Sequence, residues 1–314
     1  MPAAARIRPL DVLSQTEWEH LRRRSNVIGL GLVVHCWAII AAAMALAIWQ
    51  PWLIPLAIPV IGARQLGLAI LMHEAAHGGL SKHTKVNDFT GHWLVGAPIG
   101  AHLGNYRSYH LTHHKYAQQP EDPDLILSAP FPITKDSLRR KLVRDLTGQT
   151  FWKQRKNQFA KAFGYGQSRS RGRENLSQSA REAVIPFLIV NAVILAGLSL
   201  AGYWWAYIVL WLVPLATWNM MVTRIRNIAE HAVVPDHADP MRHARTTRIN
   251  WIESFFIAPY WVNFHCEHHM FMHLPCYRLG QAHRLLERKG VTERMEVQRG
   301  YKHVIGMAAS KAPV

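Results

Sequence analysis

Histidines recur in this sequence at spacings that would place them on one face of a helix. The segment "HEAAH" at 73–77 holds His73 and His77 at i and i+4, and "NIAEH" at 227–231 holds Asn227 and His231 at the same spacing. Two further segments, "HLTHH" at 110–114 and "HCEHH" at 265–269, each carry histidines at i, i+3 and i+4. Such residues project from one helical face, within reach of a common centre. Because imidazole binds iron, zinc, copper and nickel, these segments predict a metal site.

The supply of ligands is larger than one metal ion needs. The four segments together offer ten side chains: His73, His77, His110, His113, His114, Asn227, His231, His265, His268 and His269. A mononuclear site takes roughly three to six ligands. If all ten side chains converge, the sequence therefore predicts two metal ions.

One segment also fits a different class of enzyme. "HEAAH" matches H-E-x-x-H, the zinc protease motif in which the two histidines bind the metal and the glutamate, here Glu74, acts as general base. A protease of this kind needs only one further ligand. It would leave both H-x-x-H-H segments unexplained, so the protease is kept only as a distant alternative.

Four apolar segments surround the histidines and predict an all-α membrane protein. The chain has 314 residues, of which 49% are hydrophobic. Candidate spans occupy residues 27–48, 52–72, 183–201 and 203–222, each close to the length that crosses a bilayer. They pair into two hairpins with very short tips. Trp49, Trp52, Tyr203, Trp204 and Trp205 cluster at these tips, where membrane-interface aromatic residues belong.

The distribution of positive charge predicts the orientation. The formal net charge is +16, yet the tips "WQPW" and "AGYW" carry no charged residue. Lysine and arginine are retained on the cytoplasmic side, so both termini and all histidine segments are expected in the cytosol, and we expect a bacterial inner membrane as the location. An apolar segment that starts near residue 27 is too long and too late for a cleavable signal. Basic residues beside spans, without a nucleic-acid-binding motif, argue against nucleic acid as a partner.

The predicted organisation has three parts. Residues 1–26 form a cytosolic N-terminal segment, 27–290 the main domain and 291–314 a C-terminal tail, of which 300–314 should be loose. Residues 73–182 and 223–290 form a helical, histidine-rich cap. Within it, the polar stretch 166–182 is expected to be a linker into the second hairpin.

These features together resemble the membrane fatty acid desaturase family. "HEAAH", "HLTHH" and "HCEHH" match its three histidine boxes in order and in their placement relative to the two hairpins. The flanking segments "HHKYAQQPEDPDL" and "HCEHHMFMHLPCYRL" are also similar to this family. The similarity covers roughly residues 27–290.

The resemblance implies a non-haem diiron centre in the cap. The nine histidines would be iron ligands, and Asn227 would hold a metal through water, as in acyl-CoA desaturases of the family. The implied reaction is O2-dependent desaturation of a long-chain fatty acyl or lipid substrate, with electrons from a ferredoxin or cytochrome b5 type protein, since no haem domain precedes residue 27 or follows residue 290. A lipid or carotenoid hydroxylase, or an acyl decarboxylase, is the alternative on the same fold.

Carboxylates near the histidines are candidates for orienting the ligands. A second layer of acceptors takes the free ring N–H of a metal-binding histidine and fixes its orientation. The candidates are Glu74, Asp122, Asp124, Glu230 and Glu267. Six other histidines lie in polar stretches and are expected to be solvated: His20, His83, His237, His243, His283 and His303.

Overall fold

The computed structural model describes residues 6–164 and 171–312, with side chains described outside 171–177, and these parts are almost entirely helical. The helices are α1 (Gln15–Leu21), α2 (Asn26–Trp49), α3 (Ile54–Ala76), α4 (Thr84–Phe89), α5 (Leu103–Tyr116), α6 (Leu125–Ser128), α7 (Lys135–Leu146), α8 (Gln149–Ala162), α9 (Arg171–Leu200), α10 (Trp204–Ala206), α11 (Val213–Ala216), α12 (Trp218–His231), α13 (Trp251–Phe256), α14 (His265–Met270), α15 (Cys276–Arg288) and α16 (Tyr301–Ala308). The strands are β1 (Thr246–Arg248) and β2 (Val297–Arg299). Single turns of 3-10 or π-helix fill several junctions: η1 (Pro9–Asp11), η2 (Pro51–Leu53), η3 (Thr90–Gly96), η4 (Ala97–Ile99), η5 (Tyr207–Leu212) and η6 (Val291–Arg294).

The first hairpin consists of α2 and α3, which pack side by side. Helix α2 begins after Ser25, whose side-chain oxygen accepts a hydrogen bond from the N–H of Ile28, a typical N-cap. The helix ends at Trp49, just before Pro51, which cannot continue it. Helix α3 runs past the predicted end of its span at residue 72 and continues to Ala76. His73 is therefore part of the same rigid rod as the span.

The second hairpin joins α9 to a helical run from Trp204 to His231. Its tip is built around Gly202, which has a φ of +84°. The N–H of Tyr203 bonds the carbonyl of Leu198 at 2.7 Å, and the N–H of Gly202 bonds that of Ser199 at 2.9 Å. This pattern is a Schellman motif, which requires a left-handed residue at that position. The run comprises α10, η5, α11 and α12, and it carries His231 at its last residue.

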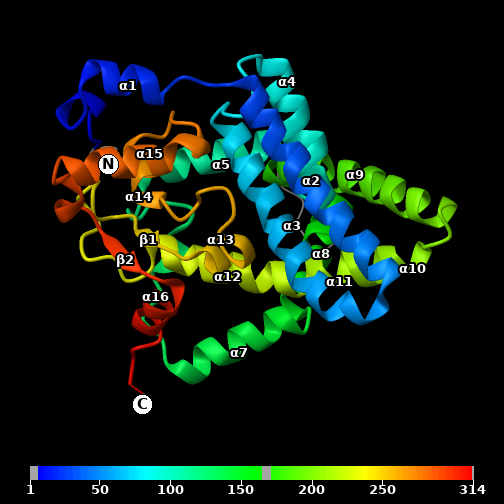
Figure 1. Ribbon diagram of the computed structural model, residues 1–314. Coiled ribbons are helices and arrows are strands. Elements are labelled where there is room, and N and C mark those ends of the chain that lie inside the picture. The colour runs from blue at the N-terminus through cyan, green and yellow to red at the C-terminus, as the bar shows by residue number, and fades with distance from the viewer. Residues whose placement is uncertain (1–5, 165–170, 313–314) are drawn as a thin grey trace.

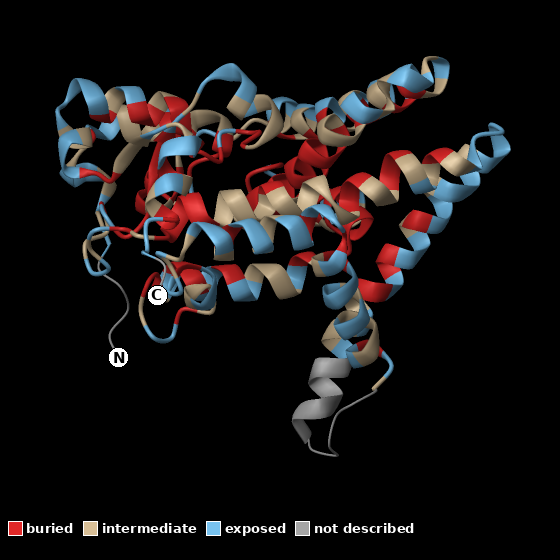
Figure 2. Ribbon diagram, turned by 90° about the horizontal axis from the view of Figure 1, so that it is seen from below, coloured by how far each residue is buried: buried red, intermediate tan, exposed pale blue. Residues whose placement is uncertain are grey.

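Within the described residues, four helical stretches are long and apolar enough to cross a membrane. They are Asn26–Trp49, Pro51–Ala76, Gln178–Leu200 and Trp204–His231, which agree with the four predicted spans. Figure 1 shows the two hairpins pointing to one side of the molecule and the elements with the histidines on the other, where the described residues also begin and end. In Figure 2 the ends of the hairpins are largely exposed, whereas the region where they meet the cap is buried.

The structure corrects two sequence predictions about segments outside the histidine groups. The polar stretch 166–182 lies partly outside the described residues, but from Arg171 onward it is the first part of α9 rather than a linker. Residues 300–314 are not a loose tail over their described part, because α16 packs against α12. Strand β2 pairs in parallel with β1, and the buried Tyr301 side chain anchors the start of α16.

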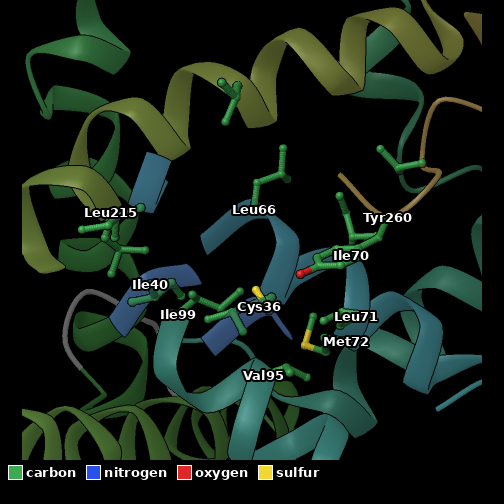
Figure 3. Close-up of a cluster of buried hydrophobic side chains, with 14 of the residues drawn as sticks. Cys36, Ile40, Leu66, Ile70, Leu71, Met72, Val95, Ile99, Leu215 and Tyr260 are labelled. Atoms are coloured by element: carbon green, nitrogen blue, oxygen red, sulfur yellow. The ribbon is translucent and has the colours of Figure 1, made fainter. Parts of the chain in front are cut away.

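The main core fills the space where the first hairpin meets the second and the cap. Figure 3 shows Ile40 and Cys36 from α2 facing Leu66, Ile70 and neighbouring residues of α3. Tyr260, from the loop between α13 and α14, lies among them. This packing fixes α3 against the cap and thereby sets the position of the histidines at its end.

Candidate metal centre

Nine of the ten predicted side chains gather in two adjacent groups. The first group contains His73, His77, His110, His114 and His268, and the second contains His113, His231, His265 and His269. Within each group the nitrogen atoms lie within 4.8 Å of one another. The groups are neighbours, since the ring centroids of His114 and His269 are 4.4 Å apart.

Four elements supply the nine side chains, and helical geometry explains how they divide. In α5, His110 and His114 join the first group and His113 the second; in α14, His265 and His269 join the second group and His268 the first. Residues at i and i+4 differ by about 40° around the helix, whereas i+3 and i+4 differ by about 100°. Each histidine triplet therefore contributes to both groups. Its i and i+4 members join one group, and its i+3 member joins the other. The spacing predicted that each triplet would reach one common centre, whereas the structure divides each triplet between two neighbouring groups.

The Nε2 atoms converge at distances that suit metal coordination. His114 Nε2 lies 2.9 Å from the Nε2 atoms of both His110 and His268. In the second group, His265 Nε2 lies 2.9 Å from that of His231 and 3.1 Å from that of His269. Ligands bound about 2.1 Å from one metal at right angles are about 3.0 Å apart. A neutral imidazole has one N–H, so mutual hydrogen bonds cannot satisfy all these nitrogens.

Two nitrogens of the first group, His73 Nε2 and His77 Nδ1, are buried and make no hydrogen bond within the described chain. The ring of His73 is part of the group through this Nε2 side. A buried polar atom without a partner is costly, so such an atom calls for an explanation. A bound metal ion supplies one, and the donor set of neutral imidazoles without thiolates suits iron, zinc, copper or nickel. The residues present therefore fit a metal centre.

Burial keeps these imidazoles neutral, which is the form that binds metals. Burial lowers the pKa of His77 to about 3, with a further contribution from the positive charge of nearby residues. Burial, followed by the neighbouring imidazoles, also holds the pKa values of His110, His114, His265 and His268 well below the usual value. At neutral pH these five imidazoles are therefore uncharged and offer lone pairs to a metal.

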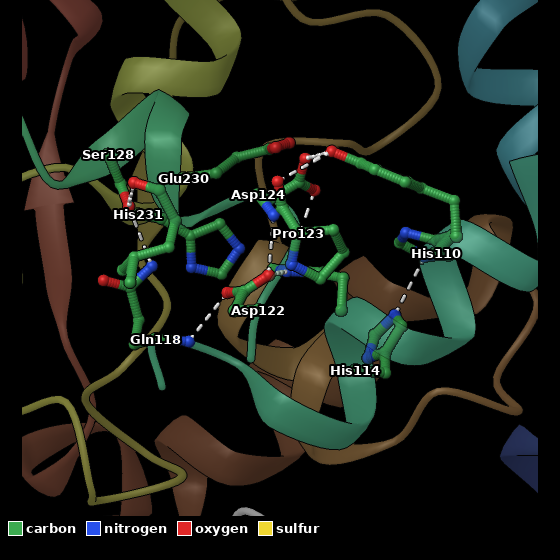
Figure 4. A network of polar contacts seen from close by, with 12 residues as sticks. His110, His114, Gln118, Asp122, Pro123, Asp124, Ser128, Glu230 and His231 are labelled. Carbon is green, nitrogen blue, oxygen red and sulfur yellow. Dashed lines mark hydrogen bonds and ion pairs between the residues drawn. The ribbon is translucent and has the colours of Figure 1, made fainter. Parts of the chain in front are cut away.

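Asp122 fixes the ring of His113. Its carboxylate lies 2.8 Å from His113 Nδ1 and also accepts hydrogen bonds from the backbone N–H groups of Gln118 and Asp124. Figure 4 shows this carboxylate on the segment after α5, next to Gln118 and Asp124. Because Nδ1 donates to Asp122, His113 presents the lone pair of Nε2 to the second group. Asp124 lies farther from His113 Nδ1, at 3.7 Å, and accepts from the hydroxyl of Tyr109.

Two other ligands of the second group have acceptors on or near α12. The Nδ1 of His231 lies 3.0 Å from the carbonyl oxygen of His243. The Nδ1 of His265 lies 3.3 Å from Glu230, which also pairs with Arg226. Asp122 and the His243 carbonyl therefore orient two of the four histidines in this group, and Glu230 lies beside the ring of a third.

The structure corrects the expected partners of Glu74 and Glu267. Glu74 accepts a hydrogen bond from the N–H of Cys276 at 3.1 Å, at the start of α15. Glu267 accepts from Thr246 Oγ1 and contacts His283 Nδ1 at 2.5 Å. Both carboxylates hold cap elements together instead of orienting a candidate ligand. Glu74 is thus engaged elsewhere, and its position does not support the zinc protease alternative.

Asn227 lies on α12 one helical turn before His231 and is partly buried. This places it on the side of α12 that carries the second group, at the i, i+4 spacing. Its role as a water-mediated ligand stays a prediction.

Two histidines expected in solvent are buried instead. His243 is 4% exposed, and its ring centroid lies 5.4 Å from that of His269. His283 is 5% exposed and bonds Glu267. The other four, His20, His83, His237 and His303, are exposed as predicted. His243 sits in the loop "PDHADPMRHARTT", where no helical spacing links it to the other histidines, so its place beside the centre depends on the tertiary fold.

Comparison with known proteins connects this geometry to a family. Dihydrorhizobitoxine desaturase of Bradyrhizobium elkanii is 26% identical over 272 residues, which cover 84% of this chain and 76% of that protein. An sn-1 oleoyl-lipid 12-desaturase of Picosynechococcus sp. is 24% identical over 296 residues, 87% of this chain and 80% of that protein. A beta-carotene ketolase of Paracoccus sp. is 23% identical over 266 residues, 81% of this chain and 91% of that protein.

The sequence model of the family described as fatty acid desaturase matches residues 49–298. The match includes the second to fourth apolar helices and every histidine of the two groups. The four apolar helices and the histidine groups agree with the architecture that the resemblance implied. The chain is therefore an integral membrane oxidoreductase that belongs to the fatty acid desaturase family.

Proposed function

We propose that this protein uses O2 to desaturate a long-chain fatty acyl or lipid substrate at a centre of two iron ions. The observation that carries the proposal is the pair of adjacent groups of buried histidines, five in one and four in the other. One such group would be sufficient for a hydrolytic metal. Two redox-active ions side by side suit an oxidation that consumes two electrons together with O2.

In this proposal each group holds one iron. The ligands would be His73, His77, His110, His114 and His268 for one ion, and His113, His231, His265, His269 and, through water, Asn227 for the other. Iron would supply the redox chemistry with O2 that removes hydrogen from an unactivated methylene, which zinc cannot do. The protein holds the rings: Asp122 and the His243 carbonyl accept the Nδ1–H groups of His113 and His231, so their Nε2 atoms face the centre, and Glu230 lies 3.3 Å from His265 Nδ1.

The names of two relatives, for an oleoyl lipid and for beta-carotene, support a lipid-like substrate. The third relative is named for dihydrorhizobitoxine. We propose that residues 27–290 form the functional domain, with the histidine centre and both termini in the cytosol of a bacterium and the hairpins in its inner membrane. An external ferredoxin or cytochrome b5 type protein would deliver the electrons to the cytosolic cap.

Oxygen insertion is the second candidate reaction. The ketolase among the relatives favours it, because the alignment with this chain covers 91% of that protein. Desaturation and hydroxylation can start from the same hydrogen removal, and they differ in whether a second hydrogen leaves or oxygen is added. The mass of the product separates them.

The test uses the purified, iron-loaded protein in lipid bilayers with O2 and a reduced ferredoxin and its reductase. Acyl-CoA, acyl carrier protein thioesters, phospholipids and free fatty acids are supplied in turn, and products are analysed by mass spectrometry. We expect about two irons per chain and a product lighter by two hydrogen atoms. A product heavier by one oxygen atom as the main species would replace desaturation with hydroxylation.

Matched variants connect the reaction to the centre. His268→Ala should lower the iron content and abolish the product, whereas His303→Ala, at an exposed histidine on α16, should change neither. Full iron content and activity in His268→Ala would overturn the ligand assignment.

A further inference from the structure

A pocket separate from the histidine groups opens between the first hairpin and the loop that connects α13 to α14. It has a volume of about 620 Å³. His35 of α2 and Arg64 of α3 line one side, and Trp251, Tyr260 and Trp261 line the other. The pocket therefore combines a charged residue from a membrane-crossing helix with aromatic residues from the cap.

Arg64 carries a buried charge without an acidic partner. Its side chain is 3% exposed, and none of the carboxylates in the described chain lies within 4.0 Å of it. One guanidinium nitrogen donates to the carbonyl of Phe255, while Nε is buried without a hydrogen-bond partner. The guanidinium lies 4.8 Å from the Phe255 ring and 5.7 Å from the Tyr260 ring. These contacts hold the group in place but leave its charge uncompensated, which is costly for a buried cation.

The opposite wall of the pocket has a strained backbone. Tyr260 and Trp261 both have positive φ values, +56° and +58°, which bulky residues rarely adopt. Strain of this kind clusters at ligand clamps and active sites, where surrounding packing maintains it. Here it directs Tyr260 into the core, beside Ile70 and Cys36 (Figure 3), with its hydroxyl 3.2 Å from His35 Nδ1. Trp261 is left 37% exposed.

Exposed aromatic and apolar residues surround the mouth of the pocket. Trp251 is 76% exposed and Ile252 is 50% exposed on the short helix α13, next to the exposed Trp261. Exposed tryptophans beside membrane-crossing helices are typical of the interface at the level of lipid head groups. A molecule that enters here would have its polar end at this interface.

The position of Arg64 on α3 relates the pocket to the metal centre. Arg64 precedes His73 by nine residues, which corresponds to about 13 Å along a helix. A head group bound at Arg64 would thus keep a chain in register with the histidines, and the position of the reaction would be counted from the head group. Guanidinium binds planar carboxylates and phosphates through paired hydrogen bonds.

We infer that this pocket binds the anionic head group, a carboxylate or a phosphate, of an amphiphile. The assignment of that amphiphile as the substrate rests on the proposed function, whereas the binding itself does not. Tyr260 and His35 add polar groups beside Arg64. The exposed tryptophans would contact the part of the amphiphile's apolar chain that follows the head group.

The experiment measures binding by native mass spectrometry with the full-length protein in a neutral detergent. The probes are palmitic acid, its methyl ester and a phosphatidic acid with palmitoyl chains. The wild-type protein should bind palmitic acid or phosphatidic acid at least about tenfold more tightly than the ester. Preference for the free acid identifies a carboxylate ligand, and preference for phosphatidic acid identifies a phospholipid head group. Equal affinity for acid, phosphatidic acid and ester would overturn the inference.

Variants locate the site. Arg64→Gln should weaken binding of the preferred anion by about 10- to 100-fold and leave ester binding unchanged, and Arg64→Lys should retain part of the preference. Arg299→Gln, which alters an exposed arginine on β2, should behave as the wild type. Undiminished anion binding in Arg64→Gln would also overturn the inference.

A labelling experiment covers the case in which Arg64→Gln fails to fold. Palmitic acid with a photoreactive group next to its carboxylate, applied to the wild-type protein, should label the peptide that contains residues 251–263. Labelling confined to other peptides would contradict the pocket assignment. None of these measurements requires O2 or electrons. Anion binding without any oxidised product would therefore refute the proposed function alone, and product formation without anion preference would refute the pocket alone.

Discussion

At the residue scale, the carboxylate of Asp122 links the candidate ligand His113 to the backbone. It is buried, and it receives hydrogen bonds from His113 and from two backbone N–H groups. Because its oxygen atoms are held on several sides, the carboxylate cannot turn away from His113. Groups that fix a ligand in this way contribute to metal affinity without touching the metal.

Replacement of Asp122 by asparagine should weaken metal binding. The neutral amide is a poorer acceptor for the His113 ring, so we expect about 10- to 100-fold lower metal affinity or activity. Competition with a chelator, followed by metal analysis, measures the change. Glu121→Gln, at the exposed neighbouring position, should match the wild type. Equal metal affinity in Asp122→Asn and the wild type would show that His113 does not need this acceptor.

The low pKa of His77 predicts how the metal-free protein responds to acid. His77 has its pKa lowered from 6.5 to about 3 by burial, so between these pH values the unfolded chain binds a proton that the folded chain does not. The free energy of unfolding should therefore fall as pH decreases below 6.5, by up to about 1.4 kcal/mol per pH unit for each such histidine. Thermal unfolding of the metal-free protein at pH 7.5 and pH 5 tests this. His77→Gln should reduce the dependence and His303→Gln should not; identical unfolding temperatures at both pH values would contradict the pKa shift.

The sequence located the residues that share helical spacing and missed those positioned only by tertiary contacts. Nine histidines at i, i+3 or i+4 were predicted to converge, and the structure brings them together. His243 was expected in solvent, yet the loop before β1 folds it against His269. The adjacent Arg245 is also buried, where it donates to the carbonyls of Ala229 and Ala232 at the end of α12. Neither residue belongs to a local sequence pattern, because each is positioned by a loop and by contacts with residues outside its own helix or strand.

At the scale of elements, close contact between α2 and the segment after α3 positions the first histidine group. A Cβ atom on Gly29 would lie 2.2 Å from the carbonyl oxygen of Leu80, three residues after His77. Arg24, just before α2, donates to the carbonyl of His77 from the other side. The beginning of α2 thus holds the end of α3 at two points.

The Gly29→Ala substitution should disturb this contact. The added methyl group meets backbone, which cannot rotate away, so we expect about 1–3 kcal/mol of destabilisation and weaker metal binding by the first group. Gly31→Ala is the matched control on the same helix, because nothing lies within 4 Å of its Cβ position. That control should be neutral or stabilise the protein by up to about 1 kcal/mol. Unfolding temperature and metal content measure both effects, and equal behaviour of the two variants would contradict the contact.

Apolar length predicted the four long helices, whereas the short elements had no comparable signal. Strands β1 and β2 contain three residues each and pair across fifty positions of sequence, from Thr246 to Val297. The C-terminal stretch was expected to be loose, but this pairing and the burial of Tyr301 and Val304 order it through residue 308. Hydrophobic periodicity needs a longer run than three residues to be recognised.

At the scale of the whole molecule, the two hairpins and the cap divide the chain into an apolar and a polar half. The tips carry exposed Trp49, Trp52 and Trp204 and no charge, whereas the histidine centre and the basic segments lie at the opposite end (Figure 1). Positive charge is retained in the cytosol, so the asymmetry predicts that the cap faces the cytosol. In that orientation the proposed redox centre would be accessible to soluble electron carriers.

This orientation can be tested by labelling cysteines introduced one at a time, in intact bacterial cells. Gln50→Cys and Ala201→Cys, at the two hairpin tips, should react with a membrane-impermeant maleimide that reaches the periplasm. Lys82→Cys and Lys289→Cys, at exposed positions of the cap, should react only after the cells are permeabilised. The native cysteines, Cys36, Cys266 and Cys276, are all buried, so they provide little background and the wild-type protein serves as the control. Labelling of Lys82→Cys in intact cells together with protection of Gln50→Cys would reverse the orientation. It would also place the histidine centre in the periplasm, away from cytosolic electron donors, because four crossings fix all segments of the cap on the same side.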